Sequence, residues 1–315
     1  MLNFIYCLDK NYNFQALTSI NSLLEAVSEK IKIFIIHDEP KTMDLSMLKN
    51  SNMAEIYKYK IDTKNIDFPN LKGSHVSKAT YFRMFISKFL PKDLDFIIYM
   101  DSDIICLNNP LPSIKKTVQK LESSSFTVAA RTEFDLENSI NGDNERFDKL
   151  DLKGNKYFNA GVLVLDYQFW INEQIEKNLF KILNKYYEKI KFWDQDVLNK
   201  FYDGKYYELD NNLNYEFAIF NKDKFNEDYI NNNVKFLHFN GKGKPWDSKN
   251  IFFDSSLFYQ SYFRKIHKDF YHIVVKNNIK STTEAIKILV SGKFLKLEKP
   301  FTFFILSLKA IFKIN

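Results

Sequence analysis

Two carboxylates end an apolar run in the stretch Phe96-Ile97-Ile98-Tyr99-Met100-Asp101-Ser102-Asp103-Ile104-Ile105-Cys106. The run is β-branched and aromatic, has the length of a buried strand, and is followed by the turn signal Asn108-Asn109-Pro110. In extended backbone, residues i and i+2 point to the same face, so Asp101 and Asp103 are expected side by side where a core strand emerges. Adjacent carboxylates repel each other unless a cation lies between them, and oxygen ligands suit Mg²⁺ or Mn²⁺. The pattern indicates a metal site, with a solvated turn as the alternative.

Strand-like and helical patterns alternate on both sides of this stretch. Strands are expected at residues 2–8, 31–36, 55–61, 126–130, 157–166 and 234–238, and helices at 14–27, 45–48, 80–90, 175–190 and 194–201. This order predicts an α/β fold with a mostly parallel sheet covered by helices. Ligands bind beyond the carboxyl ends of strands in such sheets, so Asp9 and Asp101 are expected at one cleft. Residues 131–156 are polar with little periodicity and are expected to form a long loop or lid.

The composition favours a cytoplasmic protein with a substantial core. The chain has 315 residues, 45% of them hydrophobic, which suits one large α/β domain with an appendage, or two domains. Cys7 and Cys106 lie in apolar strand-like runs and are expected to be buried free thiols in a reducing compartment. No signal-peptide pattern follows Met1, and no apolar run approaches the ~20 residues that span a bilayer.

The positive charge is concentrated near the C-terminus. Residues 276–315 contain eight Lys and two Glu, so their formal charge equals the +6 of the whole chain. Only four of the 45 basic residues are Arg, whereas proteins that read bases and phosphates favour Arg. No helix-turn-helix, RNA-binding or zinc-finger spacing is present. Nucleic acid is therefore not expected as a partner.

A second group of polar residues follows the strand at 234–238. The strand delivers His238 at its end, and the next loop holds Gly241, Gly243 and Lys244. Glycines let backbone N–H groups approach an anion, and a lysine neutralises its charge, which indicates a phosphate site. A basic glycine turn is the alternative, and it is favoured for this loop considered alone.

Several other residues have simple structural interpretations. The interruption Asn159-Ala160-Gly161 in the strand at 157–166 indicates a point where backbone approaches a ligand closely. Asp194 is expected to be the N-cap of its helix. Core or cleft-wall positions are expected for Trp170, Trp193 and Trp246. No function is assigned to His37, His75, His267 or His272, of which the last two are expected on a solvated helix.

Six short motifs, taken together, resemble the retaining glycosyltransferases of family 8, the group of the bacterial lipooligosaccharide galactosyltransferases and the glycogenins. In chain order they are Asp9-x-Asn11-Tyr12, Arg83, Asp101-Ser102-Asp103, Phe158-Asn159-Ala160-Gly161, Asp194-Gln195-Asp196 and His238-x-x-Gly241-x-x-Lys244-Pro245-Trp246. The resemblance spans roughly residues 1–250. It implies a GT-A catalytic domain over 1–250, a UDP-sugar donor and Mn²⁺, with Mg²⁺ as the alternative ion. Residues 251–315 would then form a helical C-terminal region.

The resemblance also implies a role for each matching residue. Asp101, Asp103 and His238 would be the metal ligands, and the imidazole favours Mn²⁺ over Mg²⁺. The substrate-binding residues would be Asp9, Asn11 and Tyr12 at the uridine, Gly241 and Lys244 at the diphosphate, Arg83, Asn159, Asp194 and Gln195 around the donor sugar, and in addition Ser102.

The catalytic candidates are Gln195, Asp194 and Asp196, with Gln195 near the anomeric carbon. Neither Asp is an obvious nucleophile, and Asp194 is preferred as a ligand of a sugar hydroxyl. We therefore expect front-face attack, in which the departing phosphate helps to deprotonate the acceptor. Ala130-Arg131 stands where the galactosyltransferases carry an Asp on the acceptor side, so the acceptor does not follow from the resemblance.

The expected function is retaining transfer of glucose or galactose from a UDP-sugar to a glycan acceptor, such as a bacterial surface polysaccharide, a lipopolysaccharide or a glycoprotein glycan. Two alternatives remain open. One is an inactive module that binds nucleotide sugars, and the other is a metal-dependent nucleotidyltransferase or phosphotransferase, because paired Asp residues also serve there.

The basic tail has the pattern of an amphipathic helix. Residues 281–284 have the form of a capping box, Gly292 stands where a helix ends, and Pro300 fits the first turn of a second helix. Apolar residues then recur at helical spacing at Phe301, Phe304, Ile305, Leu308, Ile311 and Phe312. This helix is expected to lie in a membrane interface on the inner face of the cytoplasmic membrane, near a lipid-linked acceptor, with packing on the catalytic domain as the alternative.

Overall fold

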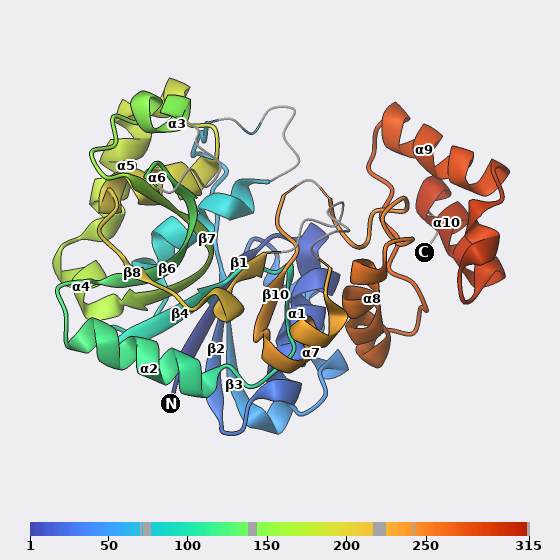
Figure 1. The fold of residues 1–315 in the computed structure, drawn as a ribbon, viewed down its shortest axis with the longest axis horizontal. Coiled ribbons are helices and arrows are strands. Elements are labelled where there is room, and N and C mark those ends of the chain that lie inside the picture. The colour runs from blue at the N-terminus through green and yellow to red at the C-terminus, as the bar shows by residue number, and fades with distance from the viewer. Residues whose placement is uncertain (70, 72–76, 138–143, 217–224, 242, 314–315) are drawn as a thin grey trace.

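A seven-stranded sheet forms the centre of the molecule. The computed structural model describes residues 1–69, 71, 77–137, 144–216, 225–241 and 243–313. Among these, the strand order is β3-β2-β1-β4-β7-β6-β8, and β7 alone runs against its neighbours (Figure 1). The strands span Asn3–Leu8 (β1), Ile31–His37 (β2), Ala54–Lys60 (β3), Phe96–Met100 (β4), Val128–Asp135 (β6), Lys156–Asp166 (β7) and Tyr207–Glu208 (β8). The predicted α/β fold with a mostly parallel sheet is confirmed.

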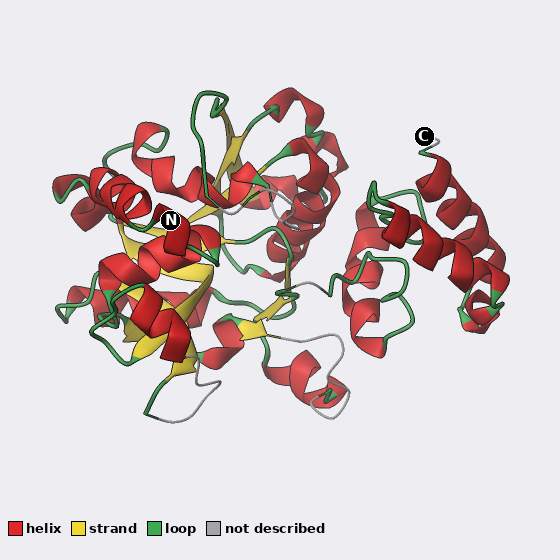
Figure 2. Ribbon diagram, turned by 90° about the horizontal axis from the view of Figure 1, so that it is seen from above, coloured by secondary structure: helices red, strands yellow, loops and turns green. Residues whose placement is uncertain are grey.

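Helices cover both faces of this sheet, and each face has its own core (Figure 2). The helices are α1 (Asn13–Ala26), α2 (Leu111–Glu122), α3 (Asn144–Lys149), α4 (Tyr167–Asn172), α5 (Ile175–Lys185), α6 (Trp193–Tyr202), α7 (Glu227–Asn233), α8 (Asp254–Ile266), α9 (Ile279–Val290) and α10 (Pro300–Phe312). Along β1, Ile5 packs into one core, whereas Phe4 and Tyr6 pack into the other, because successive side chains of a strand point to opposite faces. This double burial explains why the central strands β1, β2 and β4 are mostly apolar.

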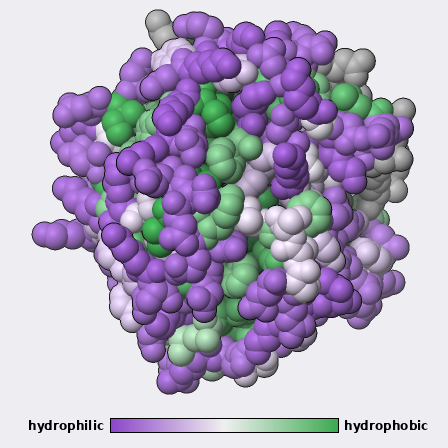
Figure 3. All heavy atoms as spheres, turned by 90° about the vertical axis from the view of Figure 1, so that its left-hand side faces the viewer, coloured by the Kyte–Doolittle hydropathy of each residue, from purple (hydrophilic) through white to green (hydrophobic). Residues whose placement is uncertain are grey.

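The first core lies beneath α4, α5, α6 and η5, an eleven-residue 3₁₀ helix over Lys78–Lys88 that carries Arg83. On α5, Ile175, Leu179 and Leu183 are buried at helical spacing. Polar residues therefore cover most of the outer surface on the side of α4 and α5 (Figure 3). The second core lies beneath α1 and α2.

The apolar stretch at 96–106 divides between two sheets. β4 ends at Met100, residues 101–103 form a turn, and β5 (Ile104–Cys106) joins a small sheet with β10 (Phe236–His238) and β9 (Tyr215–Glu216). The expected extended backbone at Asp101 and Asp103 is therefore wrong. The turn brings the carboxylates together, and the pairing of Ile104 with His238 across β5 and β10 brings the imidazole to them.

Four expected elements differ from the structure. Residues 131–156 are not one long loop, since β6 continues to Asp135 and α3 covers 144–149; residues 138–143 lie outside the described part. α5 ends at Lys185, five residues before the expected end. Phe192 occupies the N-cap of α6, and Asp194 lies in the first turn. Asn278, whose side chain accepts a hydrogen bond from the Ser281 N–H, caps α9 in place of the expected box at 281–284.

The segment after residue 250 is partly continuous with the body. On α8, Tyr259 and Phe263 pack with Phe239 and Trp246 in a third core. His267 and His272 are buried against Phe263, which contradicts the solvated helix expected for them, and the Tyr259 hydroxyl lies 2.6 Å from His272 Nδ1.

Helices α9 and α10 stand beyond α8, away from the main sheet (Figures 1 and 2). Gly292 adopts φ +68° after α9, and Pro300 opens α10, as expected. Phe294 and Phe303 pack with Ile251 and Tyr271 in a small fourth core. Within the residues described, no helix is both long and apolar enough to cross a membrane. Cys7 and Cys106 are buried free thiols, as expected.

Candidate active site

A cavity of about 310 Å³ opens at the carboxyl ends of β1 and β4. Asp9 and Asp101 both line it, as the strand order predicted. The lining also includes most of the other residues singled out from the motifs, namely Tyr12, Arg83, Ser102, Asp103, Asn159, Asp194, Gln195, His238, Gly241 and Lys244. Segments far apart in the sequence therefore converge on one site.

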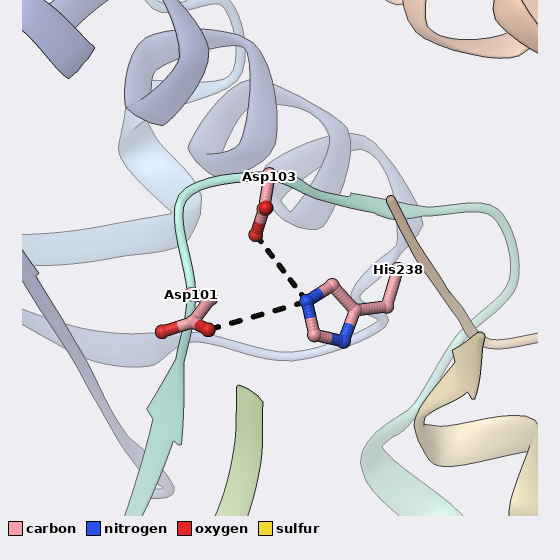
Figure 4. A group of neighbouring side chains, drawn as sticks. All are labelled: Asp101, Asp103 and His238. Atoms are coloured by element: carbon pink, nitrogen blue, oxygen red, sulfur yellow. Dashed lines mark ion pairs between the residues drawn. The ribbon is translucent and has the colours of Figure 1, made fainter. Parts of the chain in front are cut away.

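Asp101, Asp103 and His238 form a group that could hold a divalent cation (Figure 4). One ligand atom from each lies within 4.8 Å of the others. His238 Nε2 is 3.4 Å from Asp103 Oδ1 and 4.0 Å from Asp101 Oδ2. Two carboxylates and an imidazole suit a transition metal such as Mn²⁺, so the donor set fits the ion that the motifs imply.

The charges around this group are balanced by a buried lysine. Lys244 Nζ lies 2.5 Å from Asp103 Oδ2 and donates to the Phe239 carbonyl at 2.8 Å. Although burial opposes ionisation, Lys244 and His238 hold the pKa of Asp103 below its ordinary value. Burial also opposes protonation of His238, yet Asp103 and Asp101 raise its pKa. The site is therefore polarised before any ligand binds.

Arg83 connects the metal-binding group to the other side of the cavity. Its Nη2 lies 3.0 Å from Asp101 Oδ1, its Nε lies 2.5 Å from Asp194 Oδ2, and its guanidinium stacks over the Tyr99 ring. Burial raises the pKa of Asp194 to about 6, while Arg83 and a 2.6 Å hydrogen bond from Thr80 oppose that rise. Asp194 is thus held by an ion pair and does not cap its helix.

Gln195 is held by hydrogen bonds at both ends of its amide. Its Oε1 accepts from the Ala160 N–H at 2.9 Å, and its Nε2 donates to Glu133 Oε2 at 2.8 Å. Glu133 also lines the cavity. The sequence did not indicate it as a site residue, because residues 131–156 were expected to form a loop. Burial, together with Glu216, raises the pKa of Glu133 to about 7. The alternation Arg131-x-Glu133, which is typical of a strand, could have indicated that β6 continues to this residue.

A family model for glycosyl transferase family 8 matches residues 3–250. The chain belongs to this family. It is therefore a glycosyltransferase, and the family resemblance read from the motifs is confirmed.

The relatives of this chain include two enzymes named as lipopolysaccharide glycosyltransferases. The chain is 28% identical over 292 residues to lipopolysaccharide 1,3-galactosyltransferase of Salmonella typhimurium, which covers 89% of this chain and 82% of the relative. It is 27% identical over 266 residues to lipopolysaccharide 1,2-glucosyltransferase of Escherichia coli K12, and this match covers 78% of this chain and 72% of the relative. General stress protein A of Bacillus subtilis is 26% identical over 285 residues, covering 83% and 94%.

The fold is also that of a solved galactosyltransferase structure. The galactosyltransferase LgtC, solved in complex with donor and acceptor sugar analogs, matches with a TM-score of 0.68 at 17% identity. The match covers 85% of this chain and 97% of that chain. The GT-A fold expected from the motifs is confirmed.

Two of the predicted site residues, Asn11 and Asp196, lie outside the lining of the cavity. Asn11 is exposed, and its backbone N–H donates a hydrogen bond to Asp9 Oδ1. Asp196, expected among the catalytic candidates, is buried, and its oxygens accept from the Tyr157 hydroxyl and from the backbone N–H groups of Lys191 and Phe192. Because these bonds occupy the carboxylate, we withdraw Asp196 as a catalytic candidate.

The remaining expectations concern aromatic, glycine and histidine residues in or near the walls of this cavity. Tyr12 lines it and meets Trp246 edge to face at 6.1 Å between ring centroids. Trp193 is also in the lining, while Trp170 and Trp246 are buried, in agreement with core or cleft-wall positions. Gly241 adopts φ +71°, which favours glycine at this point of the loop. His37 is buried with both ring nitrogens bonded, and His75 lies outside the described residues.

Proposed function

We propose that this family 8 enzyme transfers glucose or galactose from a UDP-sugar to a glycan acceptor, with retention, and that it uses Mn²⁺, with Mg²⁺ as the alternative ion. The observation that carries the proposal is the group Asp101, Asp103 and His238 at one side of a cavity whose other side holds Asp194 and Gln195. The names of the Salmonella and Escherichia relatives, a galactosyltransferase and a glucosyltransferase, support the choice of hexose.

The donor would lie across the cavity from base to sugar. Asp9 and Tyr12 stand at the uridine end, and Gly241 and Lys244 would meet the diphosphate. A bound divalent ion would stabilise the charge of the departing UDP as a Lewis acid. The residues assigned to the donor sugar are Arg83, Asn159, Asp194 and Gln195, with Ser102 beside the metal group. We propose residues 1–250 as the catalytic domain and 251–315 as the helical C-terminal region.

Retention is best explained by front-face attack. Asp194 is engaged by Arg83 and Thr80, and Asp196 lies outside the cavity, so neither carboxylate is placed as a free nucleophile. We infer that the bond from the anomeric carbon to the phosphate breaks as the bond to the acceptor oxygen forms on the same face. The acceptor proton passes to the departing phosphate. Gln195, held by Ala160 and Glu133, would face the anomeric carbon.

UDP release from a panel of UDP-sugars, with water as the only acceptor, tests this function. We expect release from UDP-glucose or UDP-galactose that depends on Mn²⁺ and is lost in chelator. Release of nucleotide or phosphate from ATP in preference to UDP-sugars would support a nucleotidyltransferase or phosphotransferase instead. Binding of UDP-sugars without turnover, even with candidate acceptors, would support the inactive module.

We also propose that the C-terminal helices attach the enzyme to an anionic membrane, on the inner face of the cytoplasmic membrane. Phe303 packs inward on α10, whereas Phe301, Ile305 and Phe312 are exposed on another side. Exposed apolar residues of α9 and its following turn accompany them, namely Ile279, Ile286, Val290 and Leu295. With the +6 charge of residues 276–315, this surface suits a membrane interface that carries anionic headgroups.

Substitution at the exposed positions tests attachment better than truncation, because truncation would remove Phe294 and Phe303 from the fourth core. We expect Phe301→Ser with Ile305→Ser to reduce sedimentation with anionic vesicles at low salt, while hydrolysis of the UDP-sugar in solution persists. Equal sedimentation of the substituted and unsubstituted proteins would contradict attachment through α10.

A further inference from the structure

The imidazole of His238 is held by a buried amide on the side away from the carboxylates. His238 Nδ1 lies 2.9 Å from Oδ1 of Asn214, a residue with no exposed surface. The other ring nitrogen, Nε2, faces Asp101 and Asp103 (Figure 4). Nothing in the sequence motifs pointed to Asn214, which precedes β9.

The orientation of the Asn214 amide follows from its other partner. Asn159 Oδ1 accepts the backbone N–H of Gly161 at 2.9 Å, and a backbone N–H can only donate. The atom of Asn159 at this point is therefore oxygen. Asn214 reaches the same oxygen at 3.0 Å and must present its Nδ2 to it. The Asn214 atom that faces His238 is then its oxygen, which can only accept.

We infer that Asn214 is a positioning residue, which fixes the neutral tautomer of His238 with the proton on Nδ1 and the lone pair of Nε2 directed at the metal position. Nδ1 must donate because its partner is a carbonyl oxygen. Nε2 is then the only ring nitrogen that can bind a cation. This inference rests on the metal site of the proposed function and extends it to the residues that orient the ligand.

Gly161 contributes to the same arrangement because its backbone packs closely against the ring. A Cβ at Gly161 would lie 2.2 Å from His238 Cε1 and 2.8 Å from His238 Nδ1. At the Asn159-Ala160-Gly161 interruption, the backbone therefore lies close to the imidazole of His238. Asn159 Nδ2 in turn lies 3.5 Å from Glu133 Oε2. The amide of Asn214 thus donates to Asn159, and the amide of Asn159 donates to Glu133, so both donate away from His238.

The tautomer can be measured directly in the full-length protein. We would label the five histidines with ¹⁵N, remove metal at alkaline pH, and record correlations between ring nitrogens and carbon-bound ring protons, with His238→Gln as the assignment variant. We expect a pyrrole-type Nδ1 and a pyridine-type Nε2 for His238. A pyrrole-type Nε2 in the unsubstituted protein would overturn the inference.

Metal affinity provides the second measurement. We expect Asn214→Leu to yield a mixture of tautomers and to bind Mn²⁺ about 10- to 100-fold more weakly, as measured by the electron paramagnetic resonance of free Mn²⁺. Asn214→Asp still accepts from Nδ1 and should keep the tautomer. Asn199→Leu is the matched control, because Asn199 is equally buried and bonded to the backbone of Phe158.

The outcomes separate this inference from the proposed function. Unchanged tautomer and Mn²⁺ affinity in Asn214→Leu, or a tautomer change of the same size in Asn199→Leu, would overturn the positioning role. If the protein has a pyrrole-type Nδ1 at His238 and binds Mn²⁺ but releases no UDP, the positioning role of Asn214 is supported. The proposed reaction would then be contradicted.

Discussion

The Nε of Arg83 lies 2.5 Å from Oδ2 of Asp194, and both side chains are almost fully buried. The two residues are far apart in the chain, on η5 and α6, and their ion pair joins these elements in the lining of the cavity. A buried ion pair contributes little net stability, but removal of one partner leaves an uncompensated buried charge.

Arg83→Met is therefore expected to destabilise the fold by about 3–5 kcal/mol. The loss should be smaller when Asp194→Asn is present as well, because the neutral amide needs no cation. Urea unfolding of the two single variants and the double variant measures the coupling. Additive losses would show that the ion pair does not act as a unit.

Loss of a carboxylate from the metal group is expected to lower Mn²⁺-dependent turnover more than about 100-fold, since even outer partners of a ligand change affinity by 10- to 100-fold. Asp101→Asn is preferred to a change at Asp103, because its amide oxygen can still accept from Arg83, whereas Asp103 neutralises the buried Lys244. UDP release over a series of Mn²⁺ concentrations is the measurement. His238→Ala and Asp103→Ala should show the same loss, and near-normal turnover of Asp103→Ala in chelator would contradict the metal site.

Lys244→Ala is expected to weaken binding of UDP about 10- to 100-fold and to leave uridine binding nearly unchanged, because its ammonium would meet the phosphate and not the base. Tyr12→Ala should weaken both ligands. Calorimetric titration of the two variants separates these effects, with melting temperature as the control for lost pairing with Asp103. Equal losses of UDP and uridine affinity in Lys244→Ala would exclude its phosphate role.

The buried histidines of the C-terminal region predict a loss of stability in acid. Burial lowers the pKa of His267 to about 4 and that of His272 to about 3, against an ordinary value of about 6.5. The unfolded chain therefore takes up protons first, so the free energy of unfolding is highest above about pH 6.5. It should fall by about 1.4 kcal/mol per pH unit for each histidine as the pH decreases toward 4.

Urea unfolding at a series of pH values measures this slope. His272→Gln should remove the contribution of one histidine, whereas a variant of the exposed Lys268 should leave the slope unchanged. An identical slope in His272→Gln would show that other groups cause the loss.

The sequence by itself determined most strands of the main sheet and the chemistry available at their ends. Apolar runs such as 96–100 predict strands because backbone periodicity is local. The clustering of Asp9 with Asp101 followed because parallel strands place their carboxyl ends at one edge of the sheet. Residue types alone sufficed to suggest a cation at Asp101 and Asp103, whereas His238 joined this group only through the family resemblance.

Only the tertiary structure decided which polar residues serve the site and which serve the fold. Asp194 and Asp196 are two residues apart in one motif, yet one meets Arg83 in the cavity and the other is enclosed by Tyr157. Glu133 and Asn214 belong to no motif, and their hydrogen bonds join Gln195 and His238, which are distant from them in the chain. Hydrogen bonds and ion pairs form between atoms that packing brings together, so local sequence patterns carry no record of them.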